Sequence, residues 1–155
     1  MANIVRIAGI EAFDKYVKEL DPKGSPVLFC FTGATLPSGE SWCSDCNDAK
    51  PIIEEFLNEV KTSITFVYVD VGDRVYWKKL DCPFRTDNRC RLMVIPTIIR
   101  WKGVWKKPDC PFRTDRRTRL MVIPTIIRWY GVQRLEGTQC SKRELLQMLI
   151  EEDHD

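Results

Sequence analysis

With 155 residues, the chain is long enough for a substantial buried core, and we expect residues 1–155 to form a single domain. Its 24 basic and 22 acidic side chains leave a formal net charge of +2, which gives no electrostatic reason to expect nucleic acid or an anionic membrane as a partner. No apolar run approaches the roughly 20 residues of a membrane span, and residues 1–10 lack the pattern of a secretory signal. The seven cysteines are therefore most simply interpreted as thiols of a cytoplasmic protein.

The N-terminal half of the chain alternates between strand and helix patterns. Asn3 to Ala8 is a short β-prone run, and residues 10–20 repeat apolar side chains at helical spacing. Val27 to Phe31 is continuously apolar, as expected for a strand that is buried on both faces. Residues 49–60 again show helical spacing, and Ile64 to Val69 is rich in β-branched and aromatic residues, which predicts a third strand.

The most informative stretch lies between the second strand and the second helix, where Trp42 precedes a Cys-x-x-Cys pair, Cys43 and Cys46. A cysteine at a helix N-terminus is surrounded by unpaired backbone N–H groups, and these groups together with the helix dipole stabilise its thiolate. Cys46 follows about one helical turn later, where it can attack a mixed disulfide formed on Cys43. The pattern predicts a dithiol–disulfide oxidoreductase with Cys43 as the nucleophile and Cys46 as the resolving thiol.

Two uses of cysteine without catalysis remain open. A structural zinc site could combine the pair with two other cysteines, chosen from Cys82, Cys90, Cys110 and Cys140. Zinc ligands usually come as two close pairs, however, and the chain has no second Cys-x-x-Cys and one histidine, His154, in a polar tail. The other alternative is inert core thiols, and Cys30 in the buried strand pattern is expected to be one of these. We therefore expect no metal, and we expect the cysteines outside the pair to be dispensable for catalysis.

The middle of the chain contains two nearly identical segments, residues 77–104 and 105–132. They have the same length and differ only at Leu80/Pro108, Asn88/Arg116, Cys90/Thr118 and Lys102/Tyr130. Each contains a helical stretch followed by Val-Ile-Pro-Thr-Ile-Ile-Arg-Trp. Two copies are too few for a solenoid, which needs at least three repeats. We interpret them as a tandem duplication of one helix–strand segment.

The end of the chain has a strand pattern from Val132 to Glu136, followed by a last helix. Ser141 and Glu144 have the spacing of a capping box, so we expect this helix to begin at Ser141. Its apolar side chains lie on one face, which is typical of a helix that packs against a core.

The order of these elements, with Trp-Cys-x-x-Cys before a helix and Ile-Pro-Thr far downstream, resembles the thioredoxin superfamily. Pro51, inside the helix after the cysteines, where we expect a kink, strengthens the resemblance. The stretches Gly39 to Cys46 and Val71 to Lys78 are similar to the family of fourteen-kilodalton thioredoxin-related proteins, also called thioredoxin domain-containing protein 17. The resemblance implies an α/β thioredoxin fold, a central mixed β-sheet flanked by helices, with one duplicated helix–strand segment.

The same resemblance implies a cytoplasmic protein-disulfide reductase that works as a monomer. Thioredoxin reductase would be its electron donor, selected protein or small-molecule disulfides its substrates, and the dithiol its only redox group. Trp42, Ser44 and Asp45 would tune the pair, although the family usually has proline where this chain has Ser44. Ordinary thioredoxins carry a buried aspartate in the preceding strand, whereas Val27 to Phe31 contains no acid, so proton transfer must use water or another group. A binding module that lost turnover because the duplication disrupts its substrate face remains an alternative.

In this family a cis-proline packs beside the cysteine pair, and the duplication offers two candidates. The sequence favours Ile123-Pro124 over Ile95-Pro96, because residues 126–136 form a strand–turn–strand pattern that leads directly into the last helix. On this interpretation most of the first copy, from about Lys79 to Lys107, is extruded as an insertion. The opposing argument is that the first copy continues from residues 71–77 without interruption.

Overall fold

A computed structural model describes residues 2–21, 23–101 and 134–151. Its five described strands form one mixed sheet in the order β1-β3-β2-β4-β5. The strands are β1 (Ala2–Ala8), β2 (Val27–Thr32), β3 (Ile64–Asp70), β4 (Thr97–Trp101) and β5 (Arg134–Glu136). β3 runs parallel to both β1 and β2, while β4 is antiparallel to β2 and β5 is antiparallel to β4. This arrangement confirms the predicted thioredoxin fold with its mixed central sheet.

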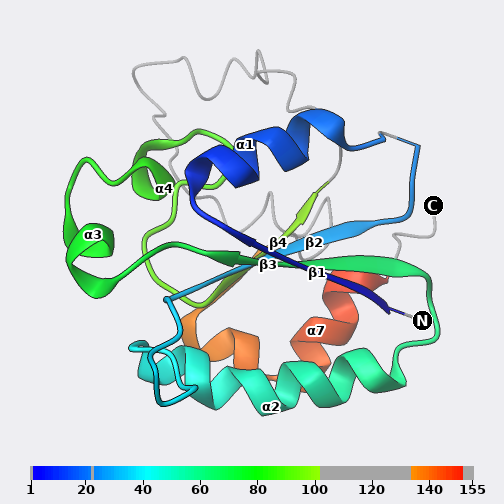
Figure 1. Ribbon diagram of the computed structural model, residues 1–155. Helices are drawn as coiled ribbons and strands as arrows, with labels where there is room; N and C mark the ends of the chain where they lie inside the picture. The colour runs from blue at the N-terminus through cyan, green and yellow to red at the C-terminus, as the bar shows by residue number, and fades with distance from the viewer. Residues whose placement is uncertain (1, 22, 102–133, 152–155) are drawn as a thin grey trace, which may run out of the picture.

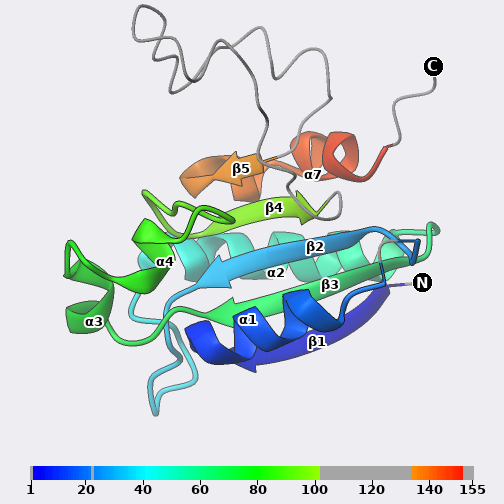
Figure 2. The same ribbon diagram turned by 90° about the horizontal axis from the view of Figure 1, so that it is seen from above.

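Helices cover both faces of the sheet (Figures 1 and 2). They are α1 (Ile10–Glu19), α2 (Ser44–Glu59), α3 (Arg74–Lys78), α4 (Pro83–Thr86), the 3-10 helix η1 (Gly137–Ser141) and α7 (Arg143–Ile150). α1 lies on one face together with α3 and α4, and α2 lies on the other face together with α7. Within the described part of the chain, no helix is long and apolar enough to cross a bilayer.

Strand β2 separates two hydrophobic cores because its side chains alternate between the faces of the sheet. Phe29 and Phe31 face the α1 side, where they pack edge-to-face with Phe13 at ring-centroid distances of 5.2 and 5.4 Å. Leu28 and Cys30 face the other side, in the core that α2 and α7 cover. Because β2 lies at the centre of the sheet, the chain leaves its carboxyl end near the middle of one sheet edge. The Cys-x-x-Cys segment follows β2 in the chain.

The first copy of the repeat is part of this core, so the predicted extrusion of residues 79–107 is wrong for the portion that the structure describes. Cys82, Phe84, Cys90 and Leu92 are all at most 2% exposed. The first copy also supplies β4, which pairs with β2 along its whole length. The segment docks because it continues directly from β3 and α3, and Phe84 then fills the space beside Phe13 and Phe31. From residue 102, the remainder of the repeat lies outside the described residues.

The capping box predicted for the last helix is also wrong. α7 begins at Arg143, and its N-cap residue Lys142 makes no side-chain capping bond. The capping box instead closes η1, where the Glu136 backbone N–H donates to the Gln139 side-chain oxygen at 3.0 Å. Ser141 ends η1 rather than starting α7, because an extra turn of 3-10 helix precedes α7. Pro51 lies within α2, which continues past it to Glu59.

Arg89 connects α1 to the segment that precedes β4, and its removal should make the protein less stable above pH 4. Its guanidinium donates to Asp14 at 2.8 Å and to Asp87 at 2.6 Å, and it lies over the Phe13 ring. These hydrogen bonds lower the pKa of Asp87, and bonds from Lys18 and Arg89 lower the pKa of Asp14. A lowered carboxyl pKa stabilises the folded state above the unfolded pKa of about 4, and this stabilisation is lost as the pH falls below it.

We expect Arg89→Gln to lower the thermal midpoint at pH 7 by roughly 4 °C. The difference from the wild type should shrink as the pH falls below about 4 towards the lowered pKa values of these two carboxyl groups. Thermal unfolding followed by circular dichroism across this pH range measures the effect, with Arg91→Gln, which bonds only the exposed Asn88 side chain among the described residues, as the control. An equal loss at pH 3 and pH 7 would contradict the electrostatic explanation.

Candidate active site

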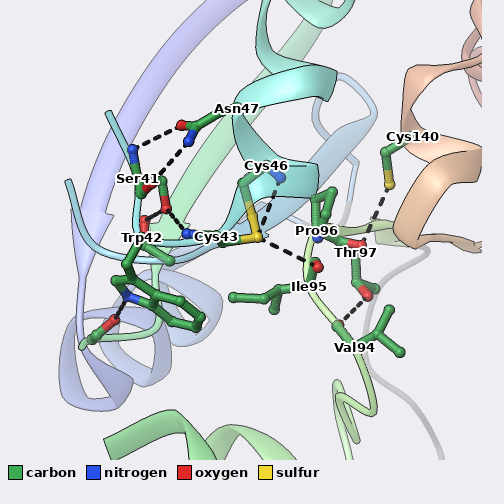
Figure 3. Close-up of a disulfide and its surroundings, with 12 residues drawn as sticks. Ser41, Trp42, Cys43, Cys46, Asn47, Val94, Ile95, Pro96, Thr97 and Cys140 are labelled. Atoms are coloured by element: carbon green, nitrogen blue, oxygen red, sulfur yellow. Dashed lines mark hydrogen bonds between the residues drawn. A yellow bond between two sulfur atoms is a disulfide. The ribbon is translucent and has the colours of Figure 1, made fainter. Parts of the chain in front are cut away.

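The cysteine pair is held in place by a network of hydrogen bonds around Ser41 (Figure 3). Asn47, in the first turn of α2, clamps the Ser41 backbone: its side-chain oxygen accepts from the Ser41 N–H, and its amide donates to the Ser41 carbonyl, both at 2.8 Å. The Ser41 hydroxyl donates to the Gly33 carbonyl at 2.9 Å and accepts from the Cys43 N–H at 3.2 Å. This network fixes the backbone that enters α2 and therefore the position of Cys43.

Trp42 lies flat against the backbone that follows β2. Its indole N–H donates to the Gly72 carbonyl at 2.9 Å. A Cβ atom added to Gly33 would lie 2.7 Å from the indole ring, so only glycine allows this close approach. The predicted redox-tuning residue therefore holds together the two loops, after β2 and after β3, that border the cysteine pair.

Cys43 and Cys46 are joined by a disulfide with a Cα–Cα distance of 5.2 Å. Cys43 is the N-cap residue of α2, and its sulfur accepts a hydrogen bond from the Cys46 N–H at 3.2 Å. The two cysteines are similarly buried, at 7% and 5% exposure, so exposure alone does not distinguish them. They differ in what they face: Cys43 lines a groove on the surface, and Cys46 lines a crevice behind it.

The proline beside the pair comes from the first copy of the repeat, and this corrects the sequence preference for the second. The Ile95–Pro96 peptide bond is cis, and the Ile95 carbonyl oxygen lies 3.6 Å from the Cys43 sulfur (Figure 3). β4 begins immediately after this bond, so its pairing with β2 places Pro96 at the carboxyl end of β2, next to the cysteines. Ile123 and Pro124 lie outside the described residues.

The groove in front of Cys43 has a volume of about 400 Å³. Trp42, Ser44 and Asp45 all contribute to its wall, and Ser44 and Asp45 are exposed at the start of α2. Ser44 makes no side-chain hydrogen bond within the described part of the chain. The three predicted tuning residues therefore do lie around Cys43, but only Trp42 has a defined partner.

The crevice behind Cys46 has a volume of about 90 Å³. Thr32, Lys50 and Tyr68 are among its lining residues, and no carboxylate is among those that the structure describes. The Tyr68 hydroxyl is buried there without a hydrogen-bond partner in the described chain, and burial raises its pKa. This space is large enough for water, which is one of the two routes for proton transfer expected from the sequence, the other being another acid.

Comparisons with known proteins relate the chain to one family. A family model described as the thioredoxin domain-containing protein 17-like thioredoxin domain matches residues 6–104, and matches again over residues 102–152. The chain belongs to this family. It is 37% identical over 97 residues to thioredoxin domain-containing protein 17 of Mus musculus and 31% identical over 97 residues to that of Homo sapiens; each match covers 63% of this chain and 76% of the relative. A crystal structure of a reduced Schistosoma mansoni thioredoxin pre-protein also matches, with a TM-score of 0.42, 19% identity, and coverage of 64% of this chain and 76% of that one.

Membership of the thioredoxin domain-containing protein 17-like family, together with the Cys43–Cys46 disulfide, makes the chain a thiol–disulfide oxidoreductase. The other described cysteines are surrounded by apolar side chains. Burial raises the pKa of Cys90 and of Cys140 to about 12 and raises that of Cys30 well above its ordinary value, so at neutral pH these groups are thiols rather than nucleophilic thiolates.

The remaining sequence expectations about cysteine concern metal binding. Cys82 is 1% exposed in the first core, and its copy Cys110 lies outside the described residues. Among the residues that the structure describes, no three His, Cys, Asp or Glu side chains lie close enough together to hold a metal ion.

Several residues of this oxidoreductase site escape a sequence search. Asn47 has no motif of its own, and the contact between Gly33 and the Trp42 ring is visible only in the structure. The Tyr-Trp-Lys stretch after β3 is visible in the sequence, but only the position of α3 shows that Trp77 and Lys78 line the groove. A signal that the sequence does offer is the glycine directly after the buried strand β2, since such positions often allow a close approach.

Pro96 and Pro124 occupy equivalent positions in the two repeat copies, but we expect only the replacement of Pro96 to lower activity strongly. Pro96 lies in the site, where it lines the crevice beside Cys46 and its carbonyl accepts from the Gly137 N–H at 2.7 Å. We expect Pro96→Ala to lower the kcat/KM for disulfide reduction by roughly tenfold, because a displacement of 1 Å in a reacting geometry has effects of this order or more. Pro124→Ala is the matched control and should stay within about twofold of the wild type on the same reasoning. A larger loss from Pro124→Ala would restore the preference for the second copy.

Proposed function

We propose that the chain is a protein-disulfide reductase of the cytoplasm that acts as a monomer and is recycled by thioredoxin reductase. The observation that carries the proposal is the position of Cys43 as the N-cap of α2, where its sulfur accepts a backbone hydrogen bond and faces an open groove. A thiolate at this position is stabilised by the helix terminus, so Cys43 is the attacking sulfur.

The reaction has two exchange steps. The Cys43 thiolate attacks one sulfur of the substrate disulfide, forms a mixed disulfide with it and releases the other substrate sulfur, which takes up a proton. The Cys46 thiol then loses its proton and attacks the Cys43 sulfur. This step releases the second substrate thiol and leaves the Cys43–Cys46 disulfide, which two electrons from NADPH, delivered by thioredoxin reductase, return to the dithiol.

The geometry also explains why each cysteine has its own role. Cys46 lies against the crevice rather than the groove, so a bound substrate reaches Cys43 first. Ile95, whose carbonyl lies near the Cys43 sulfur, forms part of the same groove and is proposed, with Pro96, to contact the substrate.

The alternative of a binding module without turnover has less support. It required the duplication to disrupt the substrate face, but the described residues that line the groove, which are 42–45, 74, 77, 78, 85 and 93–95, all precede the second copy. The two proposals differ in one measurement, the oxidation of NADPH in the presence of thioredoxin reductase and a disulfide such as insulin. The reductase proposal requires NADPH consumption that depends on this protein, and the binding module requires none.

A further inference from the structure

The groove beside Cys43 has one wall that is basic. Arg74 and Lys78 project from α3, and Arg85 follows from α4; all three line the groove, as does the indole of Trp77. Asp45 is the one carboxylate among the described lining residues. The groove therefore combines three cationic side chains with one acidic side chain, although the net charge of the whole chain is only +2.

These cations are not neutralised by neighbouring acids. No ion pair joins Arg74, Lys78 or Arg85 to a carboxylate within the described part of the chain, whereas on other surfaces Arg89 pairs with Asp14 and Asp87, and Arg134 pairs with Glu136. Arg85 is held in place: its guanidinium lies 4.2 Å from the centre of the Trp77 ring and donates to the Trp77 carbonyl at 2.8 Å. A cation that is fixed by stacking and lacks an acidic partner is oriented for a ligand.

The opposite wall of the groove is apolar. Met93 is 74% exposed and Val94 is 40% exposed, although both are large hydrophobic residues next to the buried Ile95. Cys43 of the disulfide lines the same groove as these apolar and basic side chains. A segment of polypeptide that passes over Cys43 can place an apolar side chain on Met93 and carboxylates on the cations, whereas a small disulfide would occupy only part of about 400 Å³.

We propose that this groove selects protein disulfides whose cysteine is flanked by acidic residues. The inference rests on the proposed reductase function and names its class of substrate. Opposite charges raise the association rate and hold the substrate in register, and this effect weakens as salt screens the charges. Selection by charge therefore acts on kcat/KM and depends on ionic strength, while attack by Cys43 is common to all substrates.

The test uses three synthetic peptides that contain the same intramolecular disulfide and differ only in having Glu, Gln or Lys on both sides of one cysteine. Reduction is followed with NADPH and thioredoxin reductase, with a blank for direct reduction by the reductase. At low salt we expect kcat/KM to fall in the order Glu, Gln, Lys, with about a tenfold span that shrinks to under about threefold in 0.5 M NaCl. In the double variant Arg74→Gln/Lys78→Gln, the span should fall to under about twofold, and Lys78→Glu should favour the Lys peptide.

Lys23→Gln is the matched control. Lys23 is exposed in the turn before the amino end of β2, whereas the cysteines follow the carboxyl end, so this variant should leave the span of kcat/KM among the three peptides unchanged. Arg85 is left intact because it packs on Trp77, and thermal unfolding of each variant confirms that it is folded. Equal kcat/KM for the three peptides would overturn the inference while leaving the reductase proposal standing. Failure to reduce even the Gln peptide would overturn the reductase proposal instead. A span that survives in 0.5 M NaCl would show that charge does not cause it, and an undiminished span in the folded double variant would show that Arg74 and Lys78 do not cause it.

Discussion

Cys43→Ser should abolish disulfide reduction, with a loss in kcat of at least about a thousandfold, because covalent exchange requires a sulfur nucleophile and the other described thiols are buried. Cys43 is the N-cap residue of α2 and lines the groove, so its sulfur is the one that a substrate reaches. The measurement is NADPH oxidation coupled through thioredoxin reductase, with insulin as the substrate. The matched control is Cys90→Thr, since the second copy carries Thr118 at the equivalent position, and this variant should keep its turnover.

Cys46→Ser should behave differently from Cys43→Ser. The first exchange step remains possible, so a mixed disulfide between Cys43 and the substrate should accumulate and be visible by mass spectrometry of the intact protein. Cys43→Ser should give no such adduct. An adduct through Cys46 in Cys43→Ser, with none in Cys46→Ser, would reverse the two assignments.

The sequence predicted the strands and the location of the disulfide well because these depend on local patterns. Val27 to Phe31 has no polar side chain, and the structure places it at the centre of the sheet with both faces covered. Trp42, Cys43 and Cys46 follow at fixed spacing from this strand, so a correct strand prediction placed the pair at the carboxyl end of β2. Among these local predictions, the start of helix α7 was wrong, because Ser141 is the last residue of η1.

The choice between Pro96 and Pro124 could not be made from local patterns. Each proline lies in its own copy of the stretch Val-Ile-Pro-Thr-Ile-Ile-Arg-Trp, so the preference for Pro124 depended only on the residues that follow each copy. The structure decides by packing: Phe84, in the first copy, fills the core between Phe13 and Phe31, directly after α3 has ended. Whichever identical segment first follows β3 can take this place, and that depends on chain order rather than on composition.

A second limit of prediction from sequence concerns residues whose role depends on contacts in the folded chain, such as Asn47, Gly33 and the cations of the groove. Each acts through a partner that is distant in the sequence or approaches only in the folded chain: Asn47 through the Ser41 backbone, Gly33 through the Trp42 ring. Arg74 and Lys78 have the composition of an ordinary exposed helix, and they acquire meaning because α3 packs beside the disulfide. Functional residues that lack a motif of their own become visible only with tertiary structure.

Deleting residues 105–132 should give a folded, active protein that is more stable than the full chain. β4 and β5 are antiparallel neighbours, with Ile99 opposite Arg134. In the deleted chain the same register would place Trp101 opposite Val104, leaving residues 102–103 as a two-residue turn that ends in glycine, a favoured hairpin connection. Shortening the connection between β4 and β5 from the 32 residues 102–133 to four should stabilise the protein by about 2 kcal/mol in loop-closure entropy.

Deleting residues 77–104 instead provides the matched control, because the two deletion products differ only at the four positions where the copies differ. Leu80 is 92% exposed and Asn88 is exposed, so only the exchange of the buried Cys90 for Thr118 should matter in the core, at a cost of about 1–2 kcal/mol. Both proteins should unfold cooperatively in urea and reduce insulin, the product lacking 105–132 being the more stable. If the product that lacks residues 105–132 lost its unfolding transition or its turnover, the second copy would be required for a folded, active domain. The shortened β4–β5 hairpin would then be insufficient to complete the sheet.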